Sequence, residues 1–288
     1  MFFALDLASS PLGRGEKGAR EKAGASLAAK APREQEPALA MNVVLSTLML
    51  LPGLALGSFL NVVAARVPLH ESIAFPGSHC MSCGHAIAWY DNVPLVSYIV
   101  LRGRCRSCGS SIGLRYPAVE LGTALLVSGC AWKFGLHLEA LLAVFFCAVL
   151  VAISAADLEH RIVPNVIVLP AAVVVLGAQT ALHLSVEWTI AAFAASGFLL
   201  LTALLYPGGM GMGDVKLAFL LGAMLGRTVA IALAAGMVSA LVPSIWLFIR
   251  HGSKARKMKI PFAPFLALGA VVALFVGKPL LDAYLSLF

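Results

Sequence analysis

Long apolar runs separated by short polar stretches dominate the chain from residue 43 onward. A membrane-spanning helix needs about 20 consecutive, mostly apolar residues. Eight runs have this length or come near it: 43–65, 116–134, 138–156, 163–182, 188–207, 214–227, 228–249 and 261–277. The pattern therefore predicts an all-α polytopic membrane protein with about eight transmembrane helices.

Two polar segments lie outside these runs. Residues 1–41 are mixed in charge and have little apolar periodicity, which predicts a disordered N-terminal tail. Because Met41 opens the first apolar run, a start of translation at Met41 is an alternative for this tail. The chain then divides into the tail, a first transmembrane helix at 42–65, a polar loop domain at 66–115 and a membrane domain at 116–288.

Composition supports this class. The chain is 60% hydrophobic and 12% charged, whereas a soluble domain carries about 25% charged residues. This argues against a soluble protein and for the lipid bilayer as its environment. The net charge of +7 bears on orientation in the membrane, and we expect no nucleic-acid partner.

The positions of Lys and Arg predict the orientation. If 66–115 is cytosolic, the cytosolic side receives twelve of these residues and the outer side three: Lys133, Arg227 and Lys278. This unequal distribution of Lys and Arg requires the short run 214–227 to cross the membrane. Its 14 residues, however, span only about 21 Å as a helix. A locally thin membrane or a wet cavity is therefore expected there. The tail, with six Lys and Arg, would lie outside and is the exception.

Four cysteines in the polar loop form a metal-binding pattern. Cys80 and Cys83 make one Cys-x-x-Cys pair, Cys105 and Cys108 make a second, and a glycine follows each pair directly. Two such pairs hold four thiolates in a closed tetrahedron, which is typical of structural zinc. The pattern predicts a zinc-ribbon-like cytosolic domain. A redox dithiol or cysteines without metal are the alternatives.

Two aspartates are candidates for chemistry. Asp157 follows the third run and Asp214 opens the sixth, so the predicted topology places both at cytosolic helix ends. Two neighbouring carboxylates share a proton, and one then activates water while the other polarises a carbonyl. Gly211 and Gly213 would allow close approach of backbone or substrate. Alternatively these are boundary charges, with Asp157 and Arg161 forming a helical pair.

The motifs together resemble the type IV prepilin peptidase family (prepilin leader peptidase/N-methyltransferase), of the GxGD-type intramembrane aspartic proteases. The resemblance covers about 43–285. It is carried by segments 57–63, 66–68, 91–98, 115–121, 164–165, 211–214 and 261–269, together with both cysteine pairs and Asp157.

This resemblance implies an enzyme of the bacterial cytoplasmic (inner) membrane that acts at its cytosolic face. It would remove the basic leader of type IV prepilins and pseudopilins, cleaving after a glycine. Asp157 and Asp214 would be the catalytic pair, supported by Gly211, Gly213 and Lys216. The partners implied are the prepilin or pseudopilin substrates and the lipid bilayer.

Members with the four-cysteine loop also methylate the new N-terminal amine using S-adenosylmethionine, so the resemblance implies both activities here. No Rossmann glycine fingerprint marks the donor site. Asn61, Arg66 and Glu120 are candidate methyltransferase or substrate contacts. Glu120 lies within a span, where a carboxylate faces a cavity or a partner such as Arg115 or Arg66. The structural alternative is that Asn61 and Arg66 anchor the first span at the interface and that Glu120 stabilises the fold.

Three other functions fit these residues less well. A peptidase without methyltransferase activity would keep the aspartates and use the zinc loop structurally. A proton-coupled transporter would have carboxylates near the membrane midplane, whereas these lie at one face. A non-catalytic scaffold would not need an aspartate in the GxGD setting.

Overall fold

The computed structural model describes residues 41–206, 210–252 and 260–287; the predicted tail and the basic positions 254–259 lie outside them. The first helical stretch, Met41–Leu69, contains α2 (Leu50–Arg66). The other long helices are α4 (Arg115–Phe134), α5 (Leu138–His160), α6 (Asn165–His183), α7 (Glu187–Leu205), α8 (Met212–Leu225), α9 (Val229–His251) and α10 (Ala263–Leu285). Each predicted run thus contains a helix, and the described part has isolated β-bridges but no strand. The all-α prediction is confirmed.

Six helical stretches in the described ranges are long and apolar enough to cross a membrane. One of them, Met212–His251, runs through α8, a short 3-10 turn and α9. Helix α4 is not among the six; its 20 residues include Arg115, Glu120 and Lys133. The chain is therefore a polytopic membrane protein, and the exact number of eight crossings stays a prediction.

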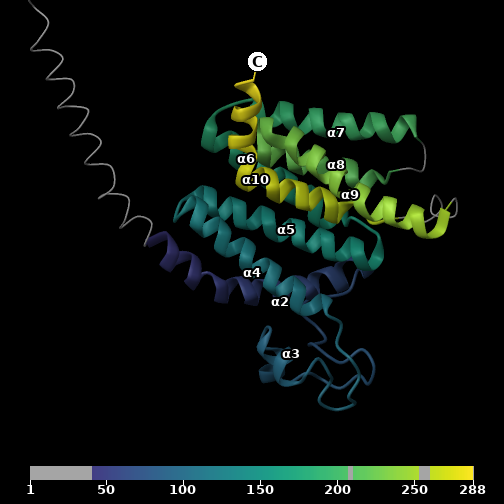
Figure 1. Ribbon diagram of the computed structural model, residues 1–288. Coiled ribbons are helices and arrows are strands. Elements are labelled where there is room, and N and C mark those ends of the chain that lie inside the picture. Colours follow the sequence, from purple (N-terminus) through teal and green to yellow (C-terminus); the bar gives the residue numbers. More distant parts are fainter. Residues whose placement is uncertain (1–40, 207–209, 253–259, 288) are drawn as a thin grey trace, which may run out of the picture.

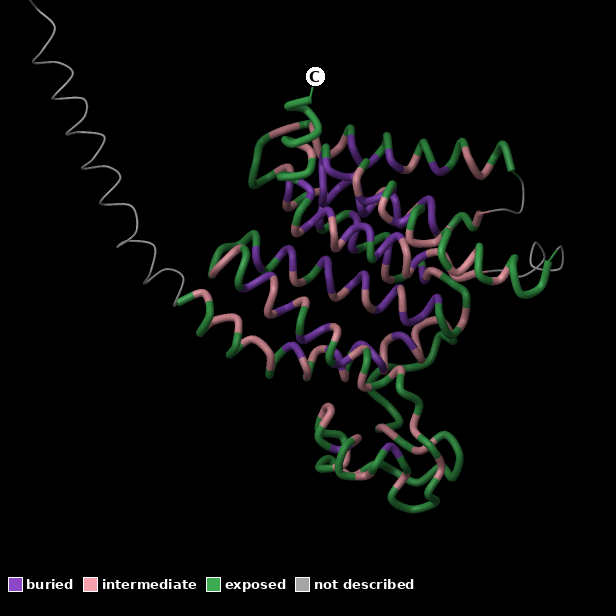
Figure 2. Tube along the Cα trace, in the orientation of Figure 1, coloured by how far each residue is buried: buried purple, intermediate pink, exposed green. Residues whose placement is uncertain are grey.

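The helices lie alongside one another in a stack, with α7 and α2 at its two edges (Figure 1). Helix α5 packs against α2, α4, α6 and α10, and α8 packs against α6, α7, α9 and α10. Their central positions bury large side chains completely, including Phe146 and Ile153 of α5 and Leu217 and Leu221 of α8. Figure 2 shows buried residues concentrated on these inner helices. The two helices that carry the candidate aspartates are thus the best enclosed.

Small residues allow the helices to approach closely. A side chain at Gly222 of α8 would collide with the backbone of Ala191 in α7. Gly269 of α10 is in the same position against Ala232 of α9. Such contacts are typical of helix packing in membranes, where van der Waals contact and not hydrophobic exclusion holds helices together.

Residues 70–114 form an irregular loop domain beside α2 and α4 (Figure 1). Its regular elements are the 3-10 turn Trp89–Asn92 and the short helix α3 (Val96–Val100). Most of its residues are exposed (Figure 2). A domain with so small an apolar core needs another source of stability, such as a metal.

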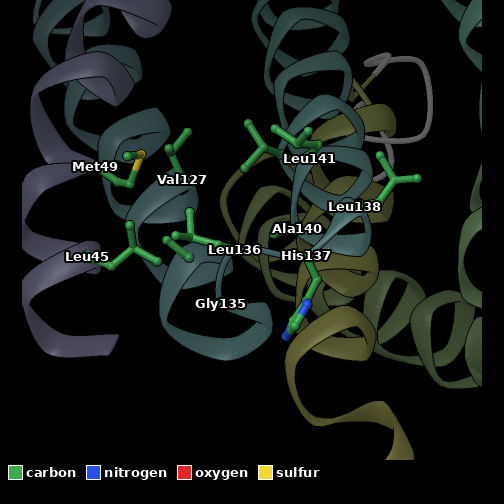
Figure 3. Close-up of a pocket in the computed structure, with 11 residues that line it drawn as sticks. Leu45, Met49, Val127, Gly135, Leu136, His137, Leu138, Ala140 and Leu141 are labelled. Carbon is green, nitrogen blue, oxygen red and sulfur yellow. The ribbon is translucent and has the colours of Figure 1, made fainter. Parts of the chain in front are cut away.

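An apolar pocket of about 290 Å³ lies between the helical residues that precede α2 and the ends of α4 and α5 remote from this loop domain (Figure 3). Leu45, Met49, Val127 and Leu141 contribute to its wall. His137 is its one ionisable lining residue. The pocket lacks the converging polar groups that a site for polar chemistry requires.

Candidate active site

Asp157 lies in the last turn of α5 and is 6% exposed. Its Oδ2 accepts a hydrogen bond of 3.1 Å from the backbone N–H of Ala263, the first residue of α10. Helix α5 ends at His160, and Arg161 adopts a left-handed conformation with φ 56°. Among the described residues no ion pair joins Arg161 to Asp157. The alternative of a simple helical ion pair is therefore not supported.

Asp214 lies in the first turn of α8 and is 9% exposed. Its backbone N–H donates to the carbonyl of Gly211 at 3.1 Å, which closes the start of the helix. A carboxylate at this end is stabilised by the helix dipole. The two aspartates lie close enough for the charge of Asp157 to act on Asp214. The fold thus brings together two carboxyl groups that are far apart in sequence.

Two residues of the Gly-rich segment and one lysine hold this arrangement. A Cβ at Gly213 would lie 2.8 Å from Cβ of Val163, so only glycine lets α8 begin against the α5–α6 linker. A Cβ at Gly211 would lie 3.5 Å from Oδ2 of Asp214. Lys216 Nζ donates to Asn165 Oδ1 at 2.8 Å, which joins α8 to α6.

The pair is suited to acid–base chemistry. Two enclosed carboxyl groups at one site favour a state in which they share one proton, so that one is a base and the other an acid. Both lie at helix ends and not at helix centres, since they occupy the last turn of α5 and the first turn of α8. This placement suits a substrate that reaches the site at the membrane surface more than a proton path across the bilayer.

The four cysteines of the loop domain form one cluster, with all four Sγ atoms within 4.8 Å of one another. The Sγ atoms of Cys80 and Cys108 are 3.8 Å apart. Tetrahedral zinc with Zn–S bonds of about 2.3 Å places its sulfur ligands about 3.8 Å apart. The cluster therefore fits a tetrahedral metal ion that all four thiolates bind.

Both cysteine pairs have the same backbone hydrogen bonds. The N–H of Cys80 donates to the carbonyl of His85 at 2.9 Å, and the N–H of Gly84 donates to the carbonyl of Cys80 at 2.8 Å. The second pair repeats these bonds at 2.8 and 2.9 Å, with Gly109 in the place of Gly84. The two glycines have φ of 69° and 71°, which explains the glycine after each pair.

Ser110 is a neighbour of this cluster that the sequence pattern did not reveal. Its Oγ lies 3.1 Å from Sγ of Cys108 and 3.6 Å from Sγ of Cys80. This hydroxyl is the main cause that lowers the pKa of the Cys80 thiol to about 5, with backbone hydrogen bonds from Ser82 and Cys83, and it also lowers the pKa of Cys108, whereas burial and the neighbouring thiols raise the pKa of Cys83 to about 11. Thiolates are the metal-binding form of cysteine, so Ser110 favours metal binding.

An ion pair joins the second cysteine pair to the rest of the loop domain. Arg106 donates two hydrogen bonds to Asp91, of 2.7 Å from Nε and 2.6 Å from Nη2. These bonds lower the pKa of Asp91. The guanidinium also lies 5.7 Å from the ring centre of Tyr90. The turn Trp89–Asn92 is thereby held against the cysteine cluster.

Glu120 joins the loop domain to α4. Its Oε2 accepts a hydrogen bond of 2.9 Å from the N–H of Leu95, which precedes α3. Of the alternatives for Glu120, an ion pair with Arg115 or Arg66 is absent among the described residues, whereas the side chain does line a cavity. Arg115 pairs with Glu159 of α5 at 2.5 Å, and the guanidinium of Arg66 is directed to backbone carbonyls.

The other two candidates lie at the same junction. Asn61 is 4% exposed, and its Nδ2 donates to the carbonyl of Tyr116 at 3.1 Å. Its Oδ1 is buried and has no hydrogen-bond partner. Arg66 donates to the carbonyls of Ser72 at 3.0 Å and Gly77 at 3.3 Å.

A cavity of about 960 Å³ lies between the loop domain and the ends of α2, α4 and α5. Asn61, Arg66 and Glu120 all line it, although they come from two helices. Glu159 and His160, at the end of α5, also line it. The fold therefore gathers the three candidates around one space that extends to the helix end carrying Asp157.

Comparison with known proteins gives two family matches. Residues 51–134 match the bacterial peptidase A24 N-terminal domain, and residues 144–247 match the type IV leader peptidase family. The first match includes the four cysteines, and the second includes both aspartates. No solved structure is significantly similar to the chain.

Curated relatives agree with these matches. The prepilin leader peptidase/N-methyltransferase of Bacillus subtilis is 33% identical over 239 residues, covering 82% of this chain and 96% of the relative. The protein of the same name from Pseudomonas aeruginosa is 35% identical over 276 residues, covering 84% and 93%. That of Myxococcus xanthus is 42% identical over 180 residues, covering 60% of this chain and 54% of its own length.

Proposed function

Because the chain belongs to the type IV leader peptidase family, we propose that it cleaves the leader from type IV prepilins and pseudopilins and then N-methylates the new N-terminus. The observation that carries the proposal is the juxtaposition of the enclosed carboxyl groups of Asp157 and Asp214 at two helix ends. An aspartic peptidase needs such a pair where substrate and water both reach it.

In this mechanism one carboxyl group acts as a general base and the other as an acid. The ionised carboxylate removes a proton from a water molecule, and the water oxygen attacks the scissile carbonyl carbon. The protonated carboxyl group donates a hydrogen bond to the carbonyl oxygen. The C–N bond then breaks, and the leaving amine takes a proton. The hydrogen bond from Ala263 leaves Oδ1 of Asp157 without a bond from that amide, so this oxygen is the one we assign to water.

The loop domain holds structural zinc in this proposal. Cys80, Cys83, Cys105 and Cys108 provide four thiolate ligands, which complete a tetrahedron and leave no position for substrate. Metal binding then contributes folding energy to a domain that has little apolar core. Gly211, Gly213 and Lys216 position the start of α8 for catalysis.

The methyltransferase activity uses S-adenosylmethionine as the methyl donor. The enzyme is oriented with the loop domain and both aspartates at the cytosolic face of the bacterial inner membrane, as the twelve-to-three distribution of Lys and Arg indicates. In this orientation, leader cleavage and methylation both occur on the cytosolic side of the membrane, where S-adenosylmethionine is available. A peptidase without methyltransferase activity and a proton-coupled transporter are not favoured by the relatives' names.

The decisive experiment is mass spectrometry of a prepilin incubated with the purified protein, with and without S-adenosylmethionine. The substrate has a basic leader, a glycine at the cleavage site and a phenylalanine after it. We expect loss of the leader in both reactions and the added mass of one methyl group only with the donor. An unchanged substrate, with a protein shown to be folded, would refute the peptidase assignment.

A further inference from the structure

We propose that the cavity between the loop domain and the ends of α2, α4 and α5 is the binding site for S-adenosylmethionine. This inference rests on the proposed methyltransferase activity and assigns it a location. The cavity volume of about 960 Å³ falls within the range of small-molecule sites, about 300–1,000 Å³. Its wall is formed by the loop domain on one side and by three membrane helices on the other.

Asn61 lines the cavity and has one side-chain atom without a hydrogen-bond partner. Oδ1 of Asn61 is buried and accepts no hydrogen bond, while the Nδ2 atom of the same side chain is bonded to Tyr116. A buried polar atom without a partner costs free energy, about 1–3 kcal/mol in proteins. A turn of the Asn61 side chain toward the cavity would expose this acceptor to a ligand, and S-adenosylmethionine offers hydrogen-bond donors in its adenine amino group, two ribose hydroxyls and ammonium group.

The charges in the wall suit a zwitterionic ligand with an additional positive charge. Arg66 lines the cavity and, within the described ranges, forms no ion pair, since its hydrogen bonds go to backbone carbonyls. It is therefore the group we assign to the ligand carboxylate, which guanidinium binds well. Glu71 and Glu120 also line the cavity and favour the ammonium and sulfonium charges.

Aromatic side chains complete the recognition surface. Tyr90, Tyr98 and Tyr116 line the cavity, and they come from both the loop domain and α4. Nucleobases stack on such rings, with about 1–3 kcal/mol for each base in single-strand-binding proteins. Arg106 lies over the Tyr90 ring and Arg115 over the Tyr116 ring, at 5.7 and 5.2 Å from the ring centres, so Tyr98 is the ring that we assign to adenine.

The cavity also extends to the place where the methyl acceptor is produced. Glu159 and His160 line it, and they follow Asp157 by two and three residues in the last turn of α5. One helical turn rises about 5.4 Å, so the wall and the catalytic carboxylate belong to the same turn. Nε2 of His160 lies 3.6 Å from Oε2 of Glu159, so the two side chains form one polar cluster at this end of the cavity. We therefore place the acceptor amine at this end of the cavity.

The methyl group passes from the sulfonium sulfur of the ligand to the amine nitrogen of the substrate in a single displacement. The lone pair of the neutral N-terminal amine attacks the methyl carbon, the C–S bond breaks, and its electron pair remains on sulfur, giving S-adenosylhomocysteine. The methylated nitrogen then loses a proton to water. A free α-amino group has a pKa of about 7.7–8.0, so a substantial fraction is neutral near pH 7.5.

The test measures binding directly. The full-length protein in detergent is titrated with S-adenosylhomocysteine by isothermal titration calorimetry, in the wild type and in Asn61→Leu and Arg66→Gln. We expect each variant to weaken binding at least tenfold. Matched controls are Asn42→Leu, at the far end of the same helical stretch, and Arg227→Gln, in the turn between α8 and α9; both should bind as the wild type does. Wild-type affinity in both cavity variants would overturn the proposal.

A second measurement does not depend on the variants' folding. Wild-type protein is labelled with a photoreactive azido-adenosyl analogue, and the labelled peptides are mapped. Labels within 66–120 or at the end of α5 support the site, and labels confined elsewhere refute it. If the wild type methylates substrate but the label lies elsewhere, only the location fails. If the wild type cleaves substrate but neither binds the ligand nor transfers methyl, the proposed methyltransferase function fails, and this inference with it.

Discussion

The backbone N–H of Ala263 donates a hydrogen bond to Oδ2 of Asp157 across 106 residues of sequence, at 3.1 Å. The bond fixes one carboxylate of the candidate pair against the start of α10. It also fixes which oxygen of that carboxylate stays free of the amide. The position of this candidate catalytic group therefore depends on a helix that contributes no carboxylate to the pair.

Asp157→Asn and Asp214→Asn should each reduce leader cleavage by at least about 100-fold, the usual contribution of a general acid or base. Asparagine keeps the shape and an acceptor oxygen for the N–H of Ala263, so loss of activity would report the lost charge and not a lost contact. The measurement is the initial rate of leader release. Asp282→Asn, at the other end of α10, is the matched control and should cleave normally. Normal cleavage by either dyad variant would remove that aspartate from the mechanism.

Gly213→Ala should reduce cleavage strongly and destabilise the protein. The new Cβ would lie 2.8 Å from Cβ of Val163, and such overpacking costs about 1–3 kcal/mol. The start of α8, and Asp214 with it, must then move. Cleavage rate and thermal unfolding are both measured. Gly197→Ala in α7, where a Cβ meets nothing within 4 Å, should leave both near wild type. An active, stable Gly213→Ala protein would contradict the proposed close packing.

Replacing Cys80 and Cys83 by serine should abolish metal binding and reduce methylation more than cleavage. The wild type should contain one zinc ion per chain, because the four thiolates form one closed site. Metal content is measured by mass spectrometry of the purified protein. Cys130→Ser tests specificity, since Cys130 lies in the membrane domain beside Cys147 and should not affect zinc. Equal loss of both activities would instead mean that the loop domain supports the whole fold.

Glu120→Ala should loosen the loop domain from the membrane helices. The variant loses the hydrogen bond from Leu95, and bonds to charged groups contribute about 1.5–3 kcal/mol. We expect protease to cut the loop domain about tenfold faster or more, as followed by limited proteolysis. Glu120→Gln keeps an acceptor and should have a smaller effect, and Glu139→Ala at the far end of α5 should have none. Unchanged proteolysis of Glu120→Ala would show that other contacts hold the domain in place.

Much of the fold could be predicted from the sequence because bilayer thickness makes local apolar length informative. The runs 138–156 and 163–182 correspond to α5 and α6, although α5 continues to His160. Local hydropathy is less informative at α4, where Glu120 and the flanking charges reduce it, and at α8, which has only 14 residues. Local hydropathy cannot tell whether such a helix crosses the bilayer, because its neighbours and not the lipid surround its polar groups.

The sequence by itself determined the all-α membrane class, the two cysteine pairs and the two candidate aspartates, because apolar length and motif spacing are local properties. Only the tertiary structure decided that Glu120 bonds to Leu95 and not to an arginine. Only the tertiary structure placed Asn61 and His160 on the wall of one cavity. These features depend on contacts between segments that are 25 to about 100 residues apart, and helix packing, which no local pattern encodes, sets such contacts.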